Sequence, residues 1–116
     1  MAYLLRFVQR FSPAHKSEFL ALEEEFAALE RARPDFPKGR RYLPAAGREP
    51  ANTLIWECEF AAMDELQSAL ALMARDPEHE ALYRKQSPYF LEAYTEIYER
   101  IAAADAADDK NHAEGT

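Results

Sequence analysis

The nine residues NTLIWECEF, numbered 52–60, alternate in a pattern that few local structures accommodate. Successive side chains of a β-strand point to opposite faces of a sheet, so the pattern predicts a strand with two different faces. One face collects Asn52, Leu54, Trp56, Cys58 and Phe60, and the other collects Thr53, Ile55, Glu57 and Glu59. A sheet covered by a hydrophobic layer on one side fits this division. The open question is whether the two glutamates face water or line an enclosed surface.

Segments with strand or helix periodicity follow one another in the order β-α-β-β-α-β. Strands are expected over residues 3–11, 39–46, 52–60 and 92–101. One helix is expected over about 13–32, and another begins at 63 or 64 and is followed by a second helical piece after Asp76-Pro77. Right-handed crossovers convert this order into an α+β, ferredoxin-like sandwich with sheet order 4-1-3-2 and the helices on one face. Pro44 lacks a backbone donor, so the short second strand should lie at the sheet edge.

The length of 116 residues fits one domain, expected over residues 1–102, with a flexible acidic tail over 103–116. The formal net charge of −7 disfavours nucleic-acid binding, and no apolar run is long enough to predict a membrane span. Cys58 is the only cysteine, so an internal disulfide is excluded and a reducing, cytoplasmic location is expected. A structural zinc site is not expected either.

A basic segment interrupts the acidic character of the chain. Its cations are Arg31, Arg33, Lys38, Arg40, Arg41 and Arg48. Two interpretations stay open at this stage, a solvated loop or a patch that binds an anion.

The three long strands divide their side chains between the two faces of the sheet. Leu5, Phe7, Leu54, Trp56, Cys58, Ile97 and Ile101 are expected to face the helices. The opposite face collects Arg6, Val8, Arg10, Thr53, Ile55, Glu57, Glu59, Tyr94, Glu96, Tyr98 and Arg100. Opposite charges then lie side by side on neighbouring strands. Two copies packed through this face would cover it, which predicts a homodimer with Glu57 and Glu59 inside, whereas a water-exposed face is the alternative. Tyr94 and Tyr98 would line a ligand pocket with Arg6 or pack across the dimer.

The block LIWECEFAAMDELQSALALMARDPEHEALYRKQSPYFLEAYTEIYERI, residues 54–101, resembles the NIPSNAP-like branch of the dimeric α/β-barrel superfamily. The similar features are a Trp-containing strand, a helix that closes at DPEHEAL and a final YTEIYE strand. The resemblance covers residues 3–101 and implies a homodimer whose sheets face each other across a shared barrel. It implies no assigned reaction, although other members of the superfamily are cofactor-independent monooxygenases or haem-degrading enzymes.

Three residues are weak catalytic candidates. Asn52 and Trp56 share a strand face, similar to an Asn-x-x-x-Trp pair of some monooxygenases, and His79 is the third. Alternatively, Asn52 ends a turn and Trp56 fills the core. No phosphate-binding, nucleophile or metal-ligand motif is present, so neither a cofactor nor a metal is expected. We therefore expect a homodimeric protein of unassigned activity that binds a small organic ligand. The alternative is a cofactor-independent monooxygenase-like enzyme for a small aromatic or carbonyl substrate.

Overall fold

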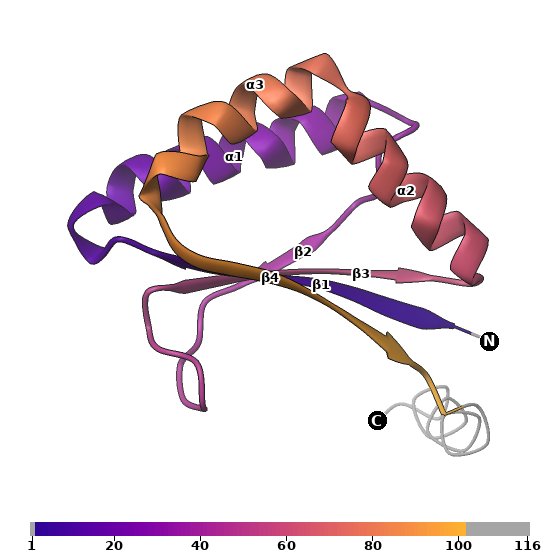
Figure 1. Cartoon of the computed structure of the whole chain (residues 1–116), viewed down its shortest axis with the longest axis horizontal. Coiled ribbons are helices and arrows are strands. Elements are labelled where there is room, and N and C mark those ends of the chain that lie inside the picture. The colour runs from indigo at the N-terminus through magenta and orange to yellow at the C-terminus, as the bar shows by residue number, and fades with distance from the viewer. Residues whose placement is uncertain (1, 102–116) are drawn as a thin grey trace, which may run out of the picture.

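A computed structural model of the chain describes residues 2–101. It contains one four-stranded sheet with the helices gathered on one of its faces (Figure 1). The elements are β1 Tyr3–Phe11, η1 Pro13–His15, α1 Lys16–Ala32, β2 Arg40–Tyr42, β3 Thr53–Phe60, α2 Met63–Arg75, α3 Pro77–Gln86, η2 Ser87–Tyr89 and β4 Phe90–Glu99. None of the helices within residues 2–101 has the length and apolar character needed to cross a membrane.

The strand order is β2-β3-β1-β4, which confirms the expected order 4-1-3-2. β1 pairs antiparallel with both β3 and β4, and the register places Arg6 opposite Glu57 on one side and Glu96 on the other. β2 lies at the sheet edge as Pro44 required. It ends at Tyr42, however, so Pro44 follows the strand and the strand is shorter than expected.

The helix boundaries follow local chemistry. The first helical segment opens as a single 3-10 turn, and α1 begins only at Lys16. Ser12 makes no side-chain cap bond; its hydroxyl lies 3.1 Å from Nδ1 of His15. Asp76 ends α2 and starts α3, because its carboxylate accepts a 3.0 Å bond from the backbone N–H of His79. The proline that follows suits the first turn of α3.

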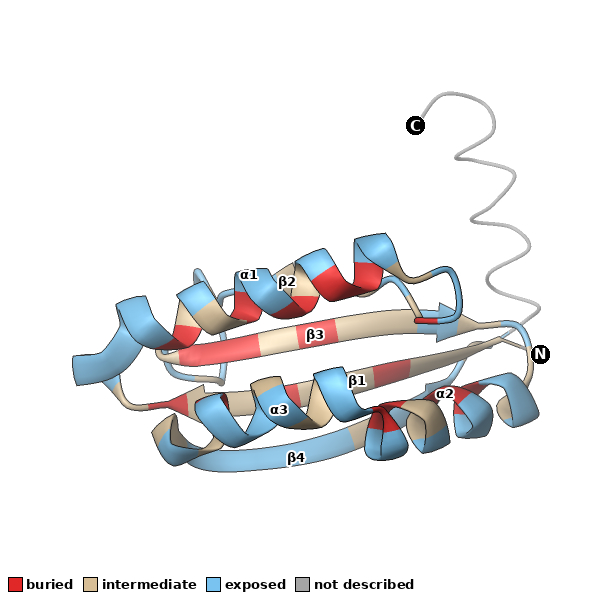
Figure 2. Cartoon of the chain, turned by 90° about the horizontal axis from the view of Figure 1, so that it is seen from above, coloured by how far each residue is buried: buried red, intermediate tan, exposed pale blue. Residues whose placement is uncertain are grey.

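The hydrophobic core lies between the helices and the two central strands, as the buried residues in Figure 2 show. α1 contributes Phe19, Phe26 and Leu29; α2 contributes Leu66, Ala69 and Met73; the sheet contributes Leu5, Phe11, Leu54 and Trp56. β4 is exposed along most of its length. The helices therefore cover β1 and β3 more completely than β4.

This uneven cover corrects one expectation. Ile97 shares the helix-facing side with Leu5 but is 39% exposed, and Ile101, beyond the end of β4, is 73% exposed. Neither belongs to the core. Val8 and Thr53 are buried although they lie on the opposite face. The connection between β2 and β3 extends on that side of the sheet (Figure 1), and its Glu49 is near enough to Tyr94 to help raise the pKa of the Tyr94 hydroxyl.

Candidate functional site

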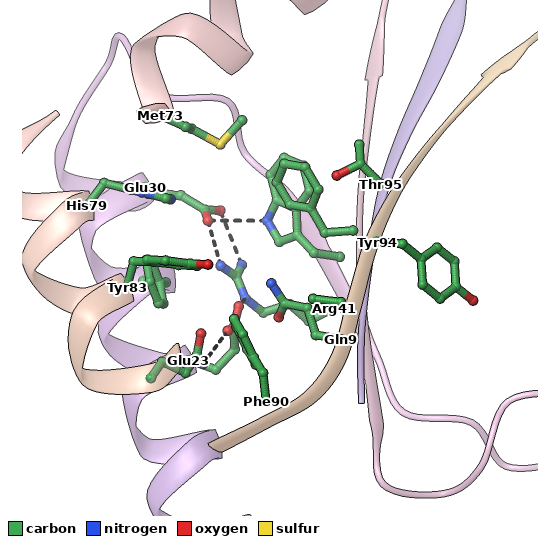
Figure 3. A pocket seen from close by; sticks show the side chains of 15 residues that line it. Gln9, Glu23, Glu30, Arg41, Met73, His79, Tyr83, Phe90, Tyr94 and Thr95 are labelled. Atoms are coloured by element: carbon green, nitrogen blue, oxygen red, sulfur yellow. Dashed lines mark hydrogen bonds and ion pairs between the residues drawn. The ribbon is translucent and has the colours of Figure 1, made fainter. Parts of the chain in front are cut away.

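A cavity of about 250 Å³ lies between the helix-facing side of the sheet and helices α1 and α3 (Figure 3). Its aromatic walls come from Phe7, Phe26, Trp56, Tyr83 and Phe90. Its polar side chains come from Gln9, Glu23, Glu30, Arg41, His79 and Gln86. An apolar pocket with a few convergent polar groups is the usual form of a small-molecule site.

The polar part of the cavity is an ion-pair group that joins the edge strand to helix α1. Arg41 donates from Nε to Glu23 at 2.6 Å, and from Nη1 and Nη2 to the two oxygens of Glu30 at 3.2 and 2.5 Å. Burial alone would lower the pKa of Arg41, but the two carboxylates more than offset this and raise it. The guanidinium is therefore held in a fixed orientation and stays charged.

Glu30 also fixes Trp56 and the loop before β2. The indole Nε1 donates to Glu30 at 3.2 Å, and the ring stacks on Phe7 with a centroid separation of 4.9 Å. The N–H of Gly39 donates to the same carboxylate at 3.1 Å. A Cβ on Gly39 would lie 1.8 Å from the indole nitrogen, so only glycine lets the backbone pass this close to the ring.

Gln86 closes the end of the cavity at the last residue of α3. It is 1% exposed, and its amide donates to Glu23 at 3.0 Å and to the carbonyl of Phe19 at 3.3 Å. These bonds tie α3 to α1 and hold the second carboxylate oxygen of Glu23. Buried polar groups held by several partners form a rigid, pre-organised surface.

His79 lies half-buried at the other end, near the start of α3. Its ring packs against Phe26 and Phe36, at centroid separations of 5.0 and 6.0 Å. Burial lowers the pKa of His79 below its ordinary value, so the imidazole is uncharged at pH 7. An uncharged imidazole can both donate and accept a hydrogen bond. Within residues 2–101, no three His, Cys, Asp or Glu side chains come together to hold a metal ion.

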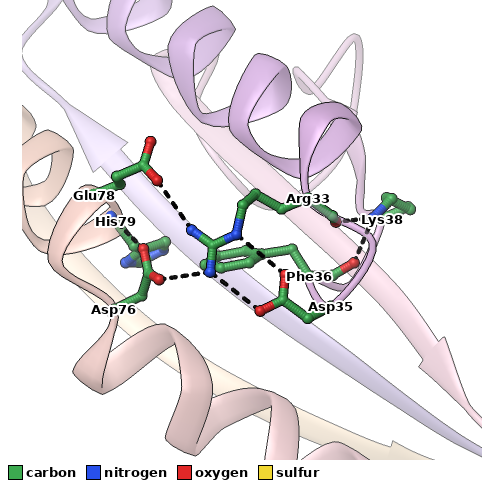
Figure 4. A network of polar contacts seen from close by, with 7 residues as sticks. All are labelled: Arg33, Asp35, Phe36, Lys38, Asp76, Glu78 and His79. Atoms are coloured by element: carbon green, nitrogen blue, oxygen red, sulfur yellow. Dashed lines mark hydrogen bonds and ion pairs between the residues drawn. The ribbon is translucent and has the colours of Figure 1, made fainter.

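A second ionic cluster fixes the loop that follows α1 (Figure 4). Arg33 donates to Asp35, Asp76 and Glu78 at 2.8–3.2 Å, and its guanidinium lies 4.8 Å from the ring centroid of Phe36. Arg33 and the N–H of His79 lower the pKa of Asp76. The cluster thereby joins the end of α1 to the α2–α3 junction and holds Phe36 beside His79.

This cluster bears on the basic segment of the sequence. Arg33 and Arg41 have carboxylate partners within the fold, and Nζ of Lys38 donates to the carbonyls of Arg33 and Phe36. These three cations build the site and its supporting loop. Lys38 is nevertheless exposed to solvent, and the bonds of these three cations within the fold distinguish them from a free anion-binding patch.

Two of the three catalytic candidates line the cavity. Trp56 and His79 do, whereas Asn52 lies outside it and donates 2.7 Å to the carbonyl of Phe11 at the end of the strand pair. Sequence reasoning missed Glu23, Glu30, Arg41 and Gln86. One signal was available for the two glutamates, because they sit seven residues apart in the apolar stripe of α1.

The opposite face of the sheet carries its own ion pairs. Arg6 donates to Glu57 at 2.7 Å and to Glu96 at 3.0 Å, and lies 5.7 Å from the ring centroid of Tyr98. Arg10 approaches Glu92 at 3.8 Å, and Glu59 pairs with Arg100 at 3.4 Å. The Tyr94 ring points away from the cavity in Figure 3, on this same face, and partial desolvation together with the nearby Glu49 raises the pKa of its hydroxyl.

Comparison with known proteins identifies the fold. Neither protein-family models nor curated proteins match the sequence. A NIPSNAP family protein from Agrobacterium tumefaciens matches over 87% of this chain and 94% of its own, with a TM-score of 0.73 and 17% identity. A NIPSNAP-like domain protein from Burkholderia xenovorans matches over 86% of this chain and 85% of its own, with a TM-score of 0.71 and 17% identity.

A more divergent structure has the same architecture. A Nitrosomonas europaea protein, provisionally assigned as an antibiotic biosynthesis monooxygenase, matches over 86% of this chain and 90% of its own, with a TM-score of 0.65 and 7% identity. At such identities the likeness establishes a shared fold and not a shared activity. The expectation from residues 54–101 is confirmed at that level: the chain has the ferredoxin-like fold of NIPSNAP family proteins.

Proposed function

We propose that the protein binds a small organic molecule in the cavity between the sheet and helices α1 and α3. The observation that carries this proposal is the cavity itself, of about 250 Å³, with aromatic walls and an ordered polar group on one side. Such a site encloses a molecule of one or two rings and orients it through a few hydrogen bonds.

The ion-pair group of Glu23, Arg41 and Glu30 is better explained by a role in ligand binding than by a contribution to stability. A buried Glu–Arg–Glu group contributes little stability compared with apolar side chains of the same volume, because three charges lose hydration. Glu23, Glu30 and Arg41 nevertheless converge on an open space instead of a filled core. Charges held in fixed positions around a cavity are suited to recognition.

The proposal includes a homodimer in the cytoplasm. The face with Arg6, Glu57 and Glu96 combines ion pairs with exposed Tyr94 and Tyr98, so a second copy could cover it without leaving an unpaired charge. The ligand cavity lies on the other face of the sheet and would stay accessible in such a dimer. A single cysteine is consistent with a reducing compartment.

One observation favours a second candidate function, a cofactor-independent monooxygenase-like enzyme. Trp56 and the uncharged His79 both line the cavity. A neutral imidazole could accept a proton from an acidic C–H or O–H group of an aromatic or carbonyl substrate. Ligand-dependent oxygen consumption that is lost in His79→Phe would support this function, and binding without oxygen consumption would leave only the first.

The test of binding uses Trp56, the single tryptophan of the chain, as a reporter inside the cavity. A panel of one- and two-ring fragments is titrated while tryptophan emission and the melting temperature are followed. Saturable quenching together with a rise in melting temperature is expected, because a ligand of the native state stabilises it.

A matched pair of variants ties the signal to the site. Ala93 and Ala28 are both exposed, but Ala93 lines the cavity, so Ala93→Leu adds bulk at the cavity, whereas Ala28→Leu adds the same bulk to α1 outside it. Ala93→Leu should abolish quenching and Ala28→Leu should retain it. If no fragment gives a saturable response, or if both variants respond alike, the proposed function is wrong.

A further inference from the structure

The positive and negative charges of the side chains that line the cavity do not sum to zero. Glu23 and Glu30 each carry one negative charge, Arg41 carries the only positive charge among the lining residues, and His79 is uncharged at pH 7. The lining therefore has a net charge of about −1 at neutral pH. A carboxylate ligand would add a second negative charge to a partly buried space.

The hydrogen bonds further distinguish the two carboxylates. Glu30 accepts four bonds, two from Arg41 and one each from Gly39 and Trp56. Glu23 accepts two, from Arg41 and Gln86. A carboxylate offers about four lone-pair sites, so Glu30 is filled while Glu23 keeps about two.

Arg41 is poorly placed to attract an anion. Three of its N–H groups already bond to carboxylates, at 2.5–3.2 Å. Its two other N–H groups make no bond to these carboxylates, but the positive charge of the guanidinium is already outweighed by the two negative charges of Glu23 and Glu30. The cavity is also lined by the aromatic residues Phe26, Trp56 and Phe90, and the face of an aromatic ring attracts cations.

We propose that the cavity selects aromatic molecules whose polar group donates hydrogen bonds, ammonium above all, and that it excludes carboxylates, with Glu23 as the accepting side chain. This inference rests on the proposed binding function and names the class of ligand for the same site. An ammonium or hydroxyl group would donate to the free lone pairs of Glu23 while its ring packs among the aromatic side chains. A carboxylate could only accept hydrogen bonds there.

Three probes of nearly equal size test the proposal: 2-phenylethylamine, 2-phenylethanol and phenylacetate, titrated against full-length protein at pH 7 with Trp56 emission as readout. The amine and the carboxylate both lose the hydration of one charge on binding. The ratio of their dissociation constants therefore reports the sign of the electrostatic potential in the cavity. The amine is expected to bind at least about tenfold more tightly than the carboxylate. Equal affinities, or tighter binding of phenylacetate, would overturn the inference.

Glu23→Gln and Glu24→Gln form a matched pair of variants. Glu23 lies in the cavity, whereas Glu24, the next residue of α1, is exposed to solvent. Glu23→Gln removes the excess charge with little change of shape, and should reduce the preference for the amine at least about threefold. Glu24→Gln should retain the wild-type preference. An unchanged preference in folded Glu23→Gln contradicts the role of Glu23.

The outcomes separate this inference from the proposed function. If Glu23→Gln does not fold, the ratio of the affinities of wild-type protein for the amine and the carboxylate still tests the charge preference. Binding of the neutral alcohol without binding of the amine refutes the charge preference and leaves the binding site in place. If none of the three probes, and no fragment of the wider panel, quenches Trp56, both proposals are wrong.

Discussion

Arg41 on the edge strand β2 and Glu30 on helix α1 are joined by two hydrogen bonds, of 3.2 Å from Nη1 to Oε1 and 2.5 Å from Nη2 to Oε2. This pair connects a three-residue strand to the helix above it, at the side of the cavity. Arg41 lies opposite Trp56 in the strand register, and Trp56 also donates to Glu30. The strand, the helix and the indole are therefore fixed by one carboxylate.

Removing that carboxylate should destabilise the whole fold. Glu30→Ala leaves the N–H groups of Trp56 and Gly39 without their acceptor and reduces Arg41 to one ionic partner. We expect a loss of about 3 kcal/mol in the free energy of unfolding, the lower end for a broken buried pair, because the Arg41 side chain is 19% exposed. Urea unfolding measures it. Glu25→Ala, at an exposed position of the same helix, should stay within about 0.5 kcal/mol.

Gly39→Ala tests the close approach of the backbone to the indole. The added methyl group would lie 1.8 Å from Nε1 of Trp56, so the ring or the loop must move. Such overpacking costs about 1–3 kcal/mol of unfolding free energy. The displaced indole should also give a red-shifted emission maximum. An unchanged emission spectrum with wild-type stability would show that the loop moves freely away from the ring.

His79 should make stability depend on pH in one direction. Its folded-state pKa is lowered by burial, whereas an unfolded histidine titrates near pH 6.5. The unfolded chain therefore binds more protons just below that pH, and the free energy of unfolding should fall as pH decreases from about 6.5. His79→Gln should flatten the profile between about pH 7 and 5. If the variant keeps the wild-type slope, His79 is not the responsible group.

The sheet face opposite the helices yields a prediction about self-association. Glu57→Ala leaves Arg6 with Glu96 as its remaining carboxylate partner, so it should weaken a homodimer formed through this face by about tenfold or more in the dissociation constant. Glu24→Ala is the control, because Glu24 is exposed on α1, on the other side of the sheet from this face. Light scattering over a dilution series measures both. A wild-type protein that is monomeric at micromolar concentration would contradict the dimer.

Most of the fold could be predicted from the sequence because its signals are local. A strand is indicated by the alternation over 52–60 alone, and a helix by the apolar stripe of Phe19, Leu22, Phe26 and Leu29. The start of another helix is indicated by Asp76-Pro77. Right-handed connections then leave few possible sheet orders. The exposure of β4 does not follow from strand periodicity, because it depends on how far the helices extend across the sheet.

The site was less predictable because it depends on contacts between distant residues. Arg41 reaches Glu23 and Glu30 from 18 and 11 positions away, and Gln86 reaches Glu23 from 63 positions away. In the sequence the arginine belongs to a basic loop and the glutamates to an amphipathic helix, so nothing links them. The one local signal is the presence of two charged residues, Glu23 and Glu30, inside the apolar stripe of α1. Charged side chains there indicate that the stripe faces more than a purely apolar core.

The ligand site is tested most directly by the indole N–H resonance of Trp56, which gives a single side-chain signal because the chain has one tryptophan. Its proton is donated to Glu30 beside the cavity, so a bound molecule must alter its environment. Titration of ¹⁵N-labelled protein with 2-phenylethylamine should shift this signal saturably in wild type and not in Ala93→Leu. A signal that stays in place throughout the titration, or that shifts equally in both proteins, would contradict a ligand site in this cavity.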